Sequence, residues 1–352
     1  MKRFYTTLLF VFAVTAAICL MESGALADSP PRQVIKLATL APRGSEIMKI
    51  LDELNAEIKA QTNNEVGFKV YYGGVQGDEK DVLRKIRMGQ LHGGAFTGYG
   101  LGTIVSEVRV TELPYLFWNN QEIDYVRAQL RETMEALFRE AGYVVIGWND
   151  VGFVYNFSKV PITSIEVARQ QKFWMWEGDP MSEAVFDAFG ITPVPLSFTE
   201  VMTSLSTKLI DTASTTPYGA VAFRWFNRFE YMEEYPVTNV IGATVVNERI
   251  WNDISEKSRE TILRIAPTHF DRMNGLNRCQ NKESIKILTK SGIQIVPFHA
   301  DANTRQFVFD AAKTARENLV GKLYSRELLD RTLSLLEEFR KAHPELGVEK
   351  LQ

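Results

Sequence analysis

Aromatic side chains crowd one segment of the chain, residues 171–217, and such side chains can form the wall of a ligand cleft. Trp174 and Trp176 offer ring surface against which apolar groups can be buried, and the hydroxyls of Thr215 and Thr216 offer hydrogen bonds. The chemistry that this set predicts is reversible binding. Ordinary core packing would also explain the tryptophans, because buried aromatic rings are common.

Three short strands joined by two helices are predicted around these side chains. Each strand run is apolar and is followed by a loop signal, such as Glu177–Pro180 after the first run. Repeated strand–helix–strand units predict parallel strands, and ligands of such open sheets bind beyond the carboxyl ends of the strands. The runs are Lys172–Trp176, Ile191–Pro195 and Leu209–Ala213, with helices at Met181–Phe189 and after a capping box formed by Ser197 and Glu200.

The first half of the chain has the same β-α-β-α-β order, so the sequence predicts two similar α/β lobes. Its predicted strands are Val34–Thr39, Val66–Tyr72 and Gly93–Thr97, and its predicted helices are Ser45–Ala60 and Glu79–Met88. Lobe I is predicted to comprise residues 28–150 and 241–280, and lobe II residues 151–240 and 281–352.

The segments that connect the lobes are also predicted from their patterns. Two extended runs on either side of Asn149–Asp150 predict a crossing between the lobes, and the chain is predicted to return along Thr238–Val246. Residues 250–288 read as mostly helical, with a kink or break at Pro267. Leucines at helical spacing predict a last, amphipathic helix over Ser325–Ala342.

The first residues have the organisation of a secretory signal peptide. A basic start, Met1–Arg3, precedes the apolar run Phe4–Leu20, and Ala25–Ala27 has the small residues of a cleavage site. We therefore expect a signal peptide over residues 1–27 and a periplasmic protein, since the apolar run is short for a membrane anchor. The net charge of −3 gives no electrostatic case for nucleic acid as a partner.

Groups that could carry out catalysis are sparse. The histidines show no paired spacing of the kind that metal ligands need. Gly98–Gly102 lacks the spacing of a dinucleotide-binding loop, and the thiol of Cys279 reads as inert. The sequence therefore predicts no enzyme activity, no metal and no cofactor. The four histidines are His92, His269, His299 and His343.

Several motifs, in their order along the chain, resemble those of the DctP-type solute-binding proteins of tripartite ATP-independent periplasmic (TRAP) transporters. The resemblance implies a periplasmic-binding-protein-like fold, in which crossing strands and a long helix join two α/β lobes that close by a hinge on a ligand cleft. It also implies that a small-molecule ligand is delivered to the small and large membrane subunits of a permease. The matching segments are Tyr72–Glu79, Arg87–Gly94, Thr111–Phe117, Pro195–Val201 and Lys208–Asp211.

The chain departs from that family at the position that usually grips the ligand. The family holds a substrate carboxylate with an arginine where this chain has Trp174, and some members add a second arginine where it has Phe153. Neither ring can replace a bidentate guanidinium, so an apolar or amphipathic ligand is expected instead. The resemblance is to a divergent branch without that arginine, whose binding proteins work with a tetratricopeptide-repeat periplasmic protein, a further candidate partner.

The predicted ligand-binding residues combine rings with small polar side chains, and Phe223 and Trp225 could extend the ring surface. They are Thr39, Phe96, Thr97, Phe153, Tyr155, Asn156, Trp174, Trp176, Glu177, Thr215 and Thr216.

Other ligand classes stay open at this point. A box of rings could hold a cation, with Glu177 or Asp179 as the counter-charge. An organic anion could be held by Arg43, Arg224 or Arg228 in a different geometry. A ligand-sensing interaction module for a membrane partner is a further alternative to transport.

Overall fold

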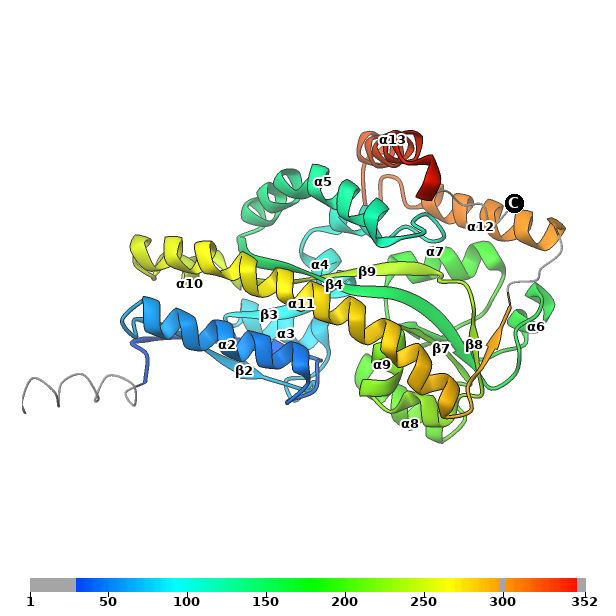
Figure 1. Cartoon of the computed structure of the whole chain (residues 1–352), viewed down its shortest axis with the longest axis horizontal. Coiled ribbons are helices and arrows are strands. Elements are labelled where there is room, and N and C mark those ends of the chain that lie inside the picture. Colours follow the sequence, from blue (N-terminus) through cyan, green and yellow to red (C-terminus); the bar gives the residue numbers. More distant parts are fainter. Residues whose placement is uncertain (1–29, 298–301, 347–352) are drawn as a thin grey trace, which may run out of the picture.

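The computed structural model describes residues 30–297 and 302–346. The predicted signal peptide, residues 1–27, lies outside the described residues, as does His299. The described chain forms an α/β protein with an eight-stranded mixed sheet, in which the strand order is β10-β8-β4-β9-β3-β1-β2 and β7 pairs with β4 (Figure 1).

The strands of the first half form a parallel group, as predicted. β1 lies between β2 and β3 and is parallel to both. The hydroxyl of Ser45 caps the helix α2, and Asp78 opens α3 in a capping box with Asp81, so both helices begin where polar side chains satisfy free backbone N–H groups. The elements are β1 (Gln33–Thr39), α2 (Glu46–Gln61), β2 (Val66–Tyr71), α3 (Glu79–Arg87), β3 (Gly93–Thr97), α4 (Gly98–Ile104) and a 3₁₀ helix η1 (Ser106–Glu112).

Two long antiparallel strands carry the sheet from the first half of the chain into the second. The sequence predicted two extended runs separated at Asn149–Asp150, but β4 is one continuous strand. It stays continuous because β9 pairs with it on both sides of that dipeptide, and register shifts at Ile146 and Val151 absorb the extra residues. These strands are β4 (Tyr143–Ser158) and β9 (Thr238–Asn247).

The strands of the second half are arranged differently from the prediction. β5 (Trp174–Trp176) and β6 (Val194–Leu196) form the expected parallel pair. β7 (Thr212–Thr215) begins three residues after the predicted start, because Leu209 lies in a bend, where it is 49% exposed. β7 pairs antiparallel with β4. A parallel unit of three strands is therefore wrong for β7, which meets the β5 segment only through a bridge between Phe173 and Thr212.

Short helices surround these strands. Pro180 at the first position and Asp179 as its cap start α7, and Gly190, with a φ of 65°, ends it. The helices and short strands of this region are α6 (Ile165–Arg169), α7 (Pro180–Phe189), η2 (Phe198–Glu200), α8 (Val201–Ser206), α9 (Pro217–Ala222), η3 (Trp225–Arg228), β8 (Tyr231–Glu233) and β10 (Gln294–Val296).

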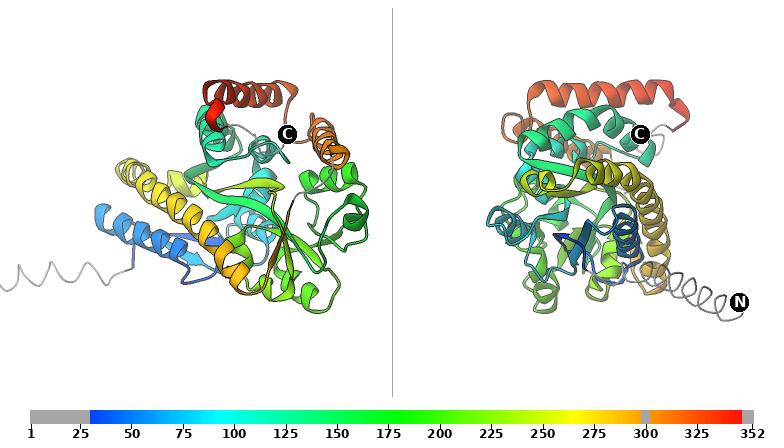
Figure 2. Two further views of the ribbon diagram at one scale, coloured as in Figure 1. Left: turned by 45° about the vertical axis from the view of Figure 1, so that its right-hand side comes forward. Right: turned by 90° about the vertical axis from the view of Figure 1, so that its left-hand side faces the viewer.

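One helix of 35 residues, α11 (Glu256–Lys290), runs along one side of the molecule past both groups of strands (Figure 2). It continues through Pro267, so of the kink or break expected there, the break is wrong. Its first half packs in a hydrophobic cluster with α2, and Leu288 near its end packs in a cluster with Trp174 and Trp225. With β4 and β9, this helix joins the two halves.

Four further helices complete the structure, and none of the helices in the described ranges has an apolar stretch long enough to cross a membrane. The last amphipathic helix is confirmed as α13, which buries Leu329 and Leu336 in one hydrophobic cluster with Leu130 of α5. The predicted boundaries put α5 and α13 in different lobes, and those boundaries stay a prediction. The helices are α5 (Asn120–Glu140), α10 (Glu248–Asn252), α12 (Ala302–Asn318) and α13 (Arg326–Ala342), followed by η4 (Pro344–Leu346).

Candidate ligand-binding cleft

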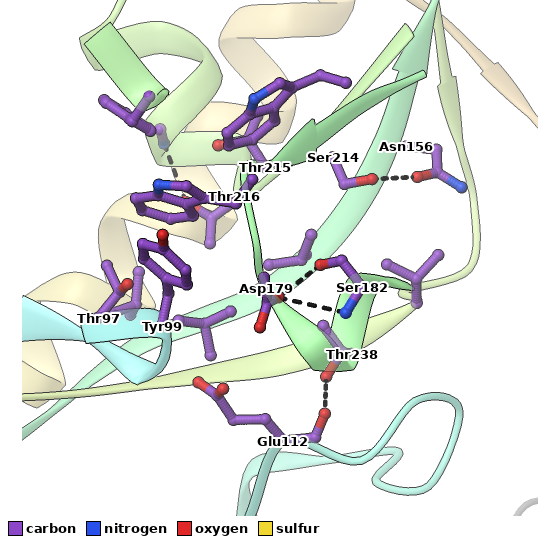
Figure 3. Close-up of a pocket in the computed structure, with 18 of the residues that line it drawn as sticks. Thr97, Tyr99, Glu112, Asn156, Asp179, Ser182, Ser214, Thr215, Thr216 and Thr238 are labelled. Carbon is purple, nitrogen blue, oxygen red and sulfur yellow. Dashed lines mark hydrogen bonds between the residues drawn. The ribbon is translucent and has the colours of Figure 1, made fainter. Parts of the chain in front are cut away.

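A cavity of about 440 Å³ lies where the two halves of the molecule meet. Thr97 and Tyr99, at the end of β3 and the start of α4, face Thr215 and Thr216 at the end of β7 across it (Figure 3). Asp179 and Ser182 of the α7 start, and Glu112 of η1, form another part of its wall.

Part of the aromatic wall predicted from the sequence lines this cavity, including Trp174, Trp176 and Phe223. The ring of Trp176 stacks on Tyr99 with a centroid distance of 4.5 Å and an interplanar angle of 25°. Trp174 lies next to Trp176 at 5.6 Å and donates from its indole nitrogen to the carbonyl of Leu196 at 3.1 Å. Phe198 and Phe223 extend the same wall.

Hydrogen bonds between the two halves hold the edge of this cavity closed. Asp78 accepts from the Trp176 indole nitrogen at 2.9 Å and from the backbone N–H of Phe198 at 2.8 Å. Tyr99 and Lys80 both donate to the carbonyl of Glu177, each at 2.9 Å. These contacts link the starts of α3 and α4 to the ends of β5 and β6, so the two halves are in direct contact at this edge of the cavity.

Among the described residues, one guanidinium lines the cavity, that of Arg109, and it is paired with two carboxylates of the protein. Arg109 donates from Nη1 and Nη2 to Asp179 at 2.7 and 3.3 Å, and its Nε lies 2.7 Å from Glu112 Oε2. The three side chains are 8%, 5% and 3% exposed. Burial acts to raise the pKa of Asp179, but Arg109 and Ser182 outweigh it and hold that pKa below its usual value. We name these side chains the Arg109 cluster.

Glu79 is a third buried carboxyl of the lining. It accepts from Thr97 N at 2.8 Å, Thr97 Oγ1 at 3.0 Å and Gly100 N at 2.7 Å. Burial nevertheless raises its pKa to about 8, and the neighbouring Asp78 adds to this rise. A Cβ on Gly100 would lie 2.5 Å from Glu79 Oε2, so the glycine is what lets the backbone approach the carboxyl.

A polar strip lies on the opposite wall. Ser214 Oγ donates to Asn156 Oδ1 at 2.6 Å, and Asn156 Nδ2 donates to Glu233 Oε2 at 2.9 Å. Burial raises the pKa of Glu233 to about 7. Burial, with a further contribution from Glu233, raises the pKa of Tyr115, which completes the strip. We use the term polar strip for Ser214, Asn156, Glu233 and Tyr115.

Beyond the polar strip, the cavity is bounded by a hydrophobic cluster. The cluster joins α6, α7 and α12, and most of its buried side chains also line the cavity. Tyr115 stacks on Phe189 of this cluster at 6.0 Å, so the polar strip borders it directly. We call it the hollow cluster, and its lining members include Ile165, Ala168, Phe173, Phe186, Phe189 and Val308.

Most of the ligand-binding residues predicted from the sequence line the cavity, although contact with a ligand stays a prediction for each of them. They lie on both halves of the molecule and come from β1, β3, β4, β5, β7 and the N-cap of α9. They are Thr39, Phe96, Thr97, Asn156, Trp174, Trp176, Thr215 and Thr216.

Phe153, Tyr155 and Glu177 do not line the cavity, in contrast to the sequence expectation. Successive side chains of a strand point to opposite faces, and the cavity face of β4 belongs to Val154 and Asn156. Phe153 instead packs against the hydrophobic cluster that contains Leu130 and Leu329, and Tyr155 packs against the cluster that contains Trp225 and Leu288. Glu177 contributes its backbone carbonyl to the closing contacts instead of its carboxylate.

Other candidates from the sequence are also placed away from the cavity. Trp225 is 2% exposed and packs edge-on against Trp174 inside the second half, whereas Phe223 lines the cavity. The guanidinium of Arg43 lies over the ring of Tyr72 at 5.1 Å. Arg224 and Arg228 are exposed and are not among the lining residues, so none of the three arginines replaces the missing guanidinium.

The sequence interpretation missed Arg109, Glu112, Glu79, Glu233 and the hollow cluster, and it named Asp179 as the counter-charge of a ligand cation, whereas Asp179 is paired with Arg109. A weak signal existed for Arg109 and Glu112, because charged residues alternate with apolar ones in residues 105–113, which is unusual for a solvated loop. Glu233 and the hollow cluster gave no signal, because long-range pairing of β8 with β4 creates the first and three distant helices create the second.

The electrostatics of the cavity are dominated by carboxyl groups. Within the described ranges, Arg109 is the only basic residue of the lining, while Glu79, Glu112, Asp179 and Glu233 are acidic. No group of three or more His, Cys, Asp or Glu side chains suited to a metal ion occurs in the described part of the chain. The arrangement can bury apolar surface, and it can accept hydrogen bonds or positive charge.

Comparisons with known proteins agree with this architecture. Residues 37–320 match the model of a family described as bacterial extracellular solute-binding protein, family 7. A solute-binding protein of Chromohalobacter salexigens is 25% identical over 61% of this chain and 64% of its own length. The ectoine/5-hydroxyectoine-binding periplasmic protein UehA of Ruegeria pomeroyi is 22% identical, and the match again covers 61% of this chain and 64% of the relative.

Solved structures confirm the two-lobed periplasmic-binding fold. A TRAP periplasmic solute-binding protein of Xanthobacter autotrophicus, with bound β-D-galacturonate, has a TM-score of 0.79 at 18% identity, covering 86% of this chain and 99% of its own. One of Citrobacter koseri, with bound D-glucuronate, has a TM-score of 0.78 at 20% identity, covering 86% and 99%. Identities this low show the fold and leave the ligand of this chain open.

Proposed function

The chain belongs to family 7 of the bacterial extracellular solute-binding proteins, the DctP-type proteins of TRAP transporters, and from this we propose that it captures one small ligand in the cleft and delivers it to a TRAP permease. Proteins of this family bind and hand over solutes and are not enzymes. We further propose that the ligand is apolar or amphipathic.

The second proposal depends on the ion pairs of Arg109, which is the single basic residue among the described residues that line the cavity. Arg109 is held by Asp179 and Glu112 on its own protein, so no cation is left to grip a ligand carboxylate. What remains open to a ligand is the aromatic wall around Trp174 and Trp176, together with the hollow cluster. Burying about 200 Å² of apolar ligand surface there would contribute about 5 kcal/mol before the costs of association.

A second candidate is an organic anion, and the solved structures favour it, because galacturonate and glucuronate are bound in the two described above. Such a ligand would have to draw Arg109 away from its carboxylates. That exchange would leave Asp179 and Glu112 buried without their counter-charge, which is costly. The occupied guanidinium therefore makes the anion the weaker candidate.

The partners and the compartment follow from the family. We propose the periplasm as the location, reached by the predicted signal peptide, and the small and large membrane subunits of a TRAP permease as partners. A tetratricopeptide-repeat protein as an additional periplasmic partner rests on the sequence resemblance alone.

Native mass spectrometry of the mature protein, purified from a lipid-containing bacterial host and gently released, tests the ligand class. We expect a co-purified apolar or amphipathic molecule in a one-to-one complex. Calorimetric titration with galacturonate and glucuronate provides the opposing arm, and tight binding of either would sink the proposal of an apolar or amphipathic ligand.

A further inference from the structure

The polar strip and the hollow cluster border each other in one cavity, and together they describe the two ends of an amphipathic molecule. We propose that the ligand is an aliphatic amine whose hydrocarbon chain fills the hollow cluster and whose ammonium group binds the carboxylate of Glu233. This inference rests on the proposed capture of an apolar or amphipathic ligand and names its chemical class.

The first argument is the incomplete hydrogen bonding of Glu233. Only Asn156 Nδ2 donates to it, at 2.9 Å to Oε2, and no basic side chain of the described residues pairs with it. Asn156 is itself fixed by Ser214, so the carboxyl is held in place in the cavity lining. An ammonium group would supply this carboxylate with further hydrogen-bond donors and with a positive charge.

The second argument is the sign of the charge. A ligand carboxylate beside Glu233 would meet a like charge without a cation between them, whereas an ammonium group would meet an opposite one. Because Arg109 is committed to Asp179 and Glu112, it cannot compensate an added negative charge. The cavity therefore discriminates between amine and acid head groups of equal size.

The third argument is the place of the hollow cluster. Tyr115 belongs to the polar strip and stacks on Phe189, a member of the hollow cluster, so head group and chain sites are adjacent. Phe173, Phe186 and Val308 offer only apolar surface at the far side. Each methylene buried there is expected to raise the affinity about fourfold.

Calorimetry with three probes of equal chain length tests the head group. We expect the mature protein to bind octylamine about tenfold or more tightly than octanol, and to bind octanoate most weakly, because a charged hydrogen-bonded pair forms only with the amine. Octanoate binding as tightly as octylamine would overturn the proposal.

A matched pair of variants locates the head-group site. Glu233→Gln keeps the shape and the Asn156 contact but removes the charge, and we expect it to lower octylamine affinity about tenfold while leaving octanol affinity nearly unchanged. Glu234→Gln makes the same change one residue along, at an exposed side chain outside the cavity lining, and should bind octylamine like the parent protein. Equal affinity of Glu233→Gln and the parent for octylamine would contradict the assignment.

A second pair locates the chain site. Ala168 lines the hollow cluster, so Ala168→Leu should fill part of it and weaken decylamine binding more than hexylamine binding. Ala188 packs against the same cluster without lining the cavity, and Ala188→Leu is the control for a general packing defect. If both variants weaken the two amines to the same extent, the chain does not occupy the hollow cluster.

The outcomes for the two proposals can be told apart. Octanol binding as tightly as octylamine, with Glu233→Gln silent, would reject the amine and leave an apolar ligand intact. Failure of octylamine, octanol and decylamine to bind at all, together with tight glucuronate binding, would reject both.

Discussion

At the Arg109 cluster a buried guanidinium meets two carboxylates, whereas at the polar strip the Glu233 carboxyl meets one amide and an open cavity. Both regions lie in the wall of the same cleft, yet only the second has capacity left for a ligand. The difference shows that counting charged residues in a cleft is not enough. What decides ligand class is which charges the protein has already neutralised.

We expect the largest effect from a substitution of Arg109. Arg109→Met removes the guanidinium and leaves Asp179 and Glu112 buried without a counter-charge, so we expect a loss of about 3–5 kcal/mol in the free energy of unfolding. Denaturant unfolding at neutral pH measures this loss. A loss below about 1 kcal/mol would mean that the cluster is not the structural ion network described here.

Glu233 should behave in the opposite way, because its carboxyl has no compensating charge. Its raised pKa of about 7 means that its contribution to stability is fully present below the unfolded-state pKa and is lost as the pH rises through 7. Glu233→Gln should therefore be more stable than the ligand-free parent at pH 9, by about 2 kcal/mol, with little difference at pH 5.

Thermal unfolding of both proteins between pH 5 and pH 9 checks this second prediction. Glu79, with a pKa of about 8, titrates in both proteins and so cancels in the comparison, and Tyr115, which faces Glu233, has a raised pKa and stays neutral over this range. A parent and variant with parallel pH profiles would place Glu233 in an ordinary, solvated setting.

We expect a smaller effect from loss of the hydrogen bond between Trp176 and Asp78, which joins the two halves at the edge of the cavity. Trp176→Phe keeps a ring against Tyr99 but removes the indole donor to Asp78, so closure should be weakened by about 1 kcal/mol and octylamine affinity should fall about fivefold. Trp174→Phe is the matched control, because its indole donates within one half, to Leu196. Calorimetry should show the larger loss for Trp176→Phe, and the reverse order would argue against a closing role for Asp78.

Much of the fold could be predicted from the sequence, because it depends on local patterns. Alternating turn signals and apolar runs fixed the strands of the first half, and helical leucine spacing identified α13. Pairing partners are non-local, so the continuous strand β4 and the antiparallel placement of β7 were not foreseen.

The site was predictable only in part, for two physical reasons. Strand alternation alone would have separated Asn156 from Phe153 and Tyr155, which was a usable signal that the interpretation did not apply. The partner of a charged side chain has no such local signal, since Arg109 and Asp179 are 70 residues apart. A missing family arginine at Trp174 was therefore visible, while the commitment of Arg109 required the structure.

A crystal structure of the mature protein with its co-purified ligand tests the central claim most directly. We predict that Arg109 still binds Asp179 and Glu112, that the ligand's apolar part contacts Trp174, Trp176 or the hollow cluster, and that its polar atom lies within hydrogen-bond distance of Glu233. An anionic ligand group bound directly to Arg109, with Asp179 released, would contradict the account.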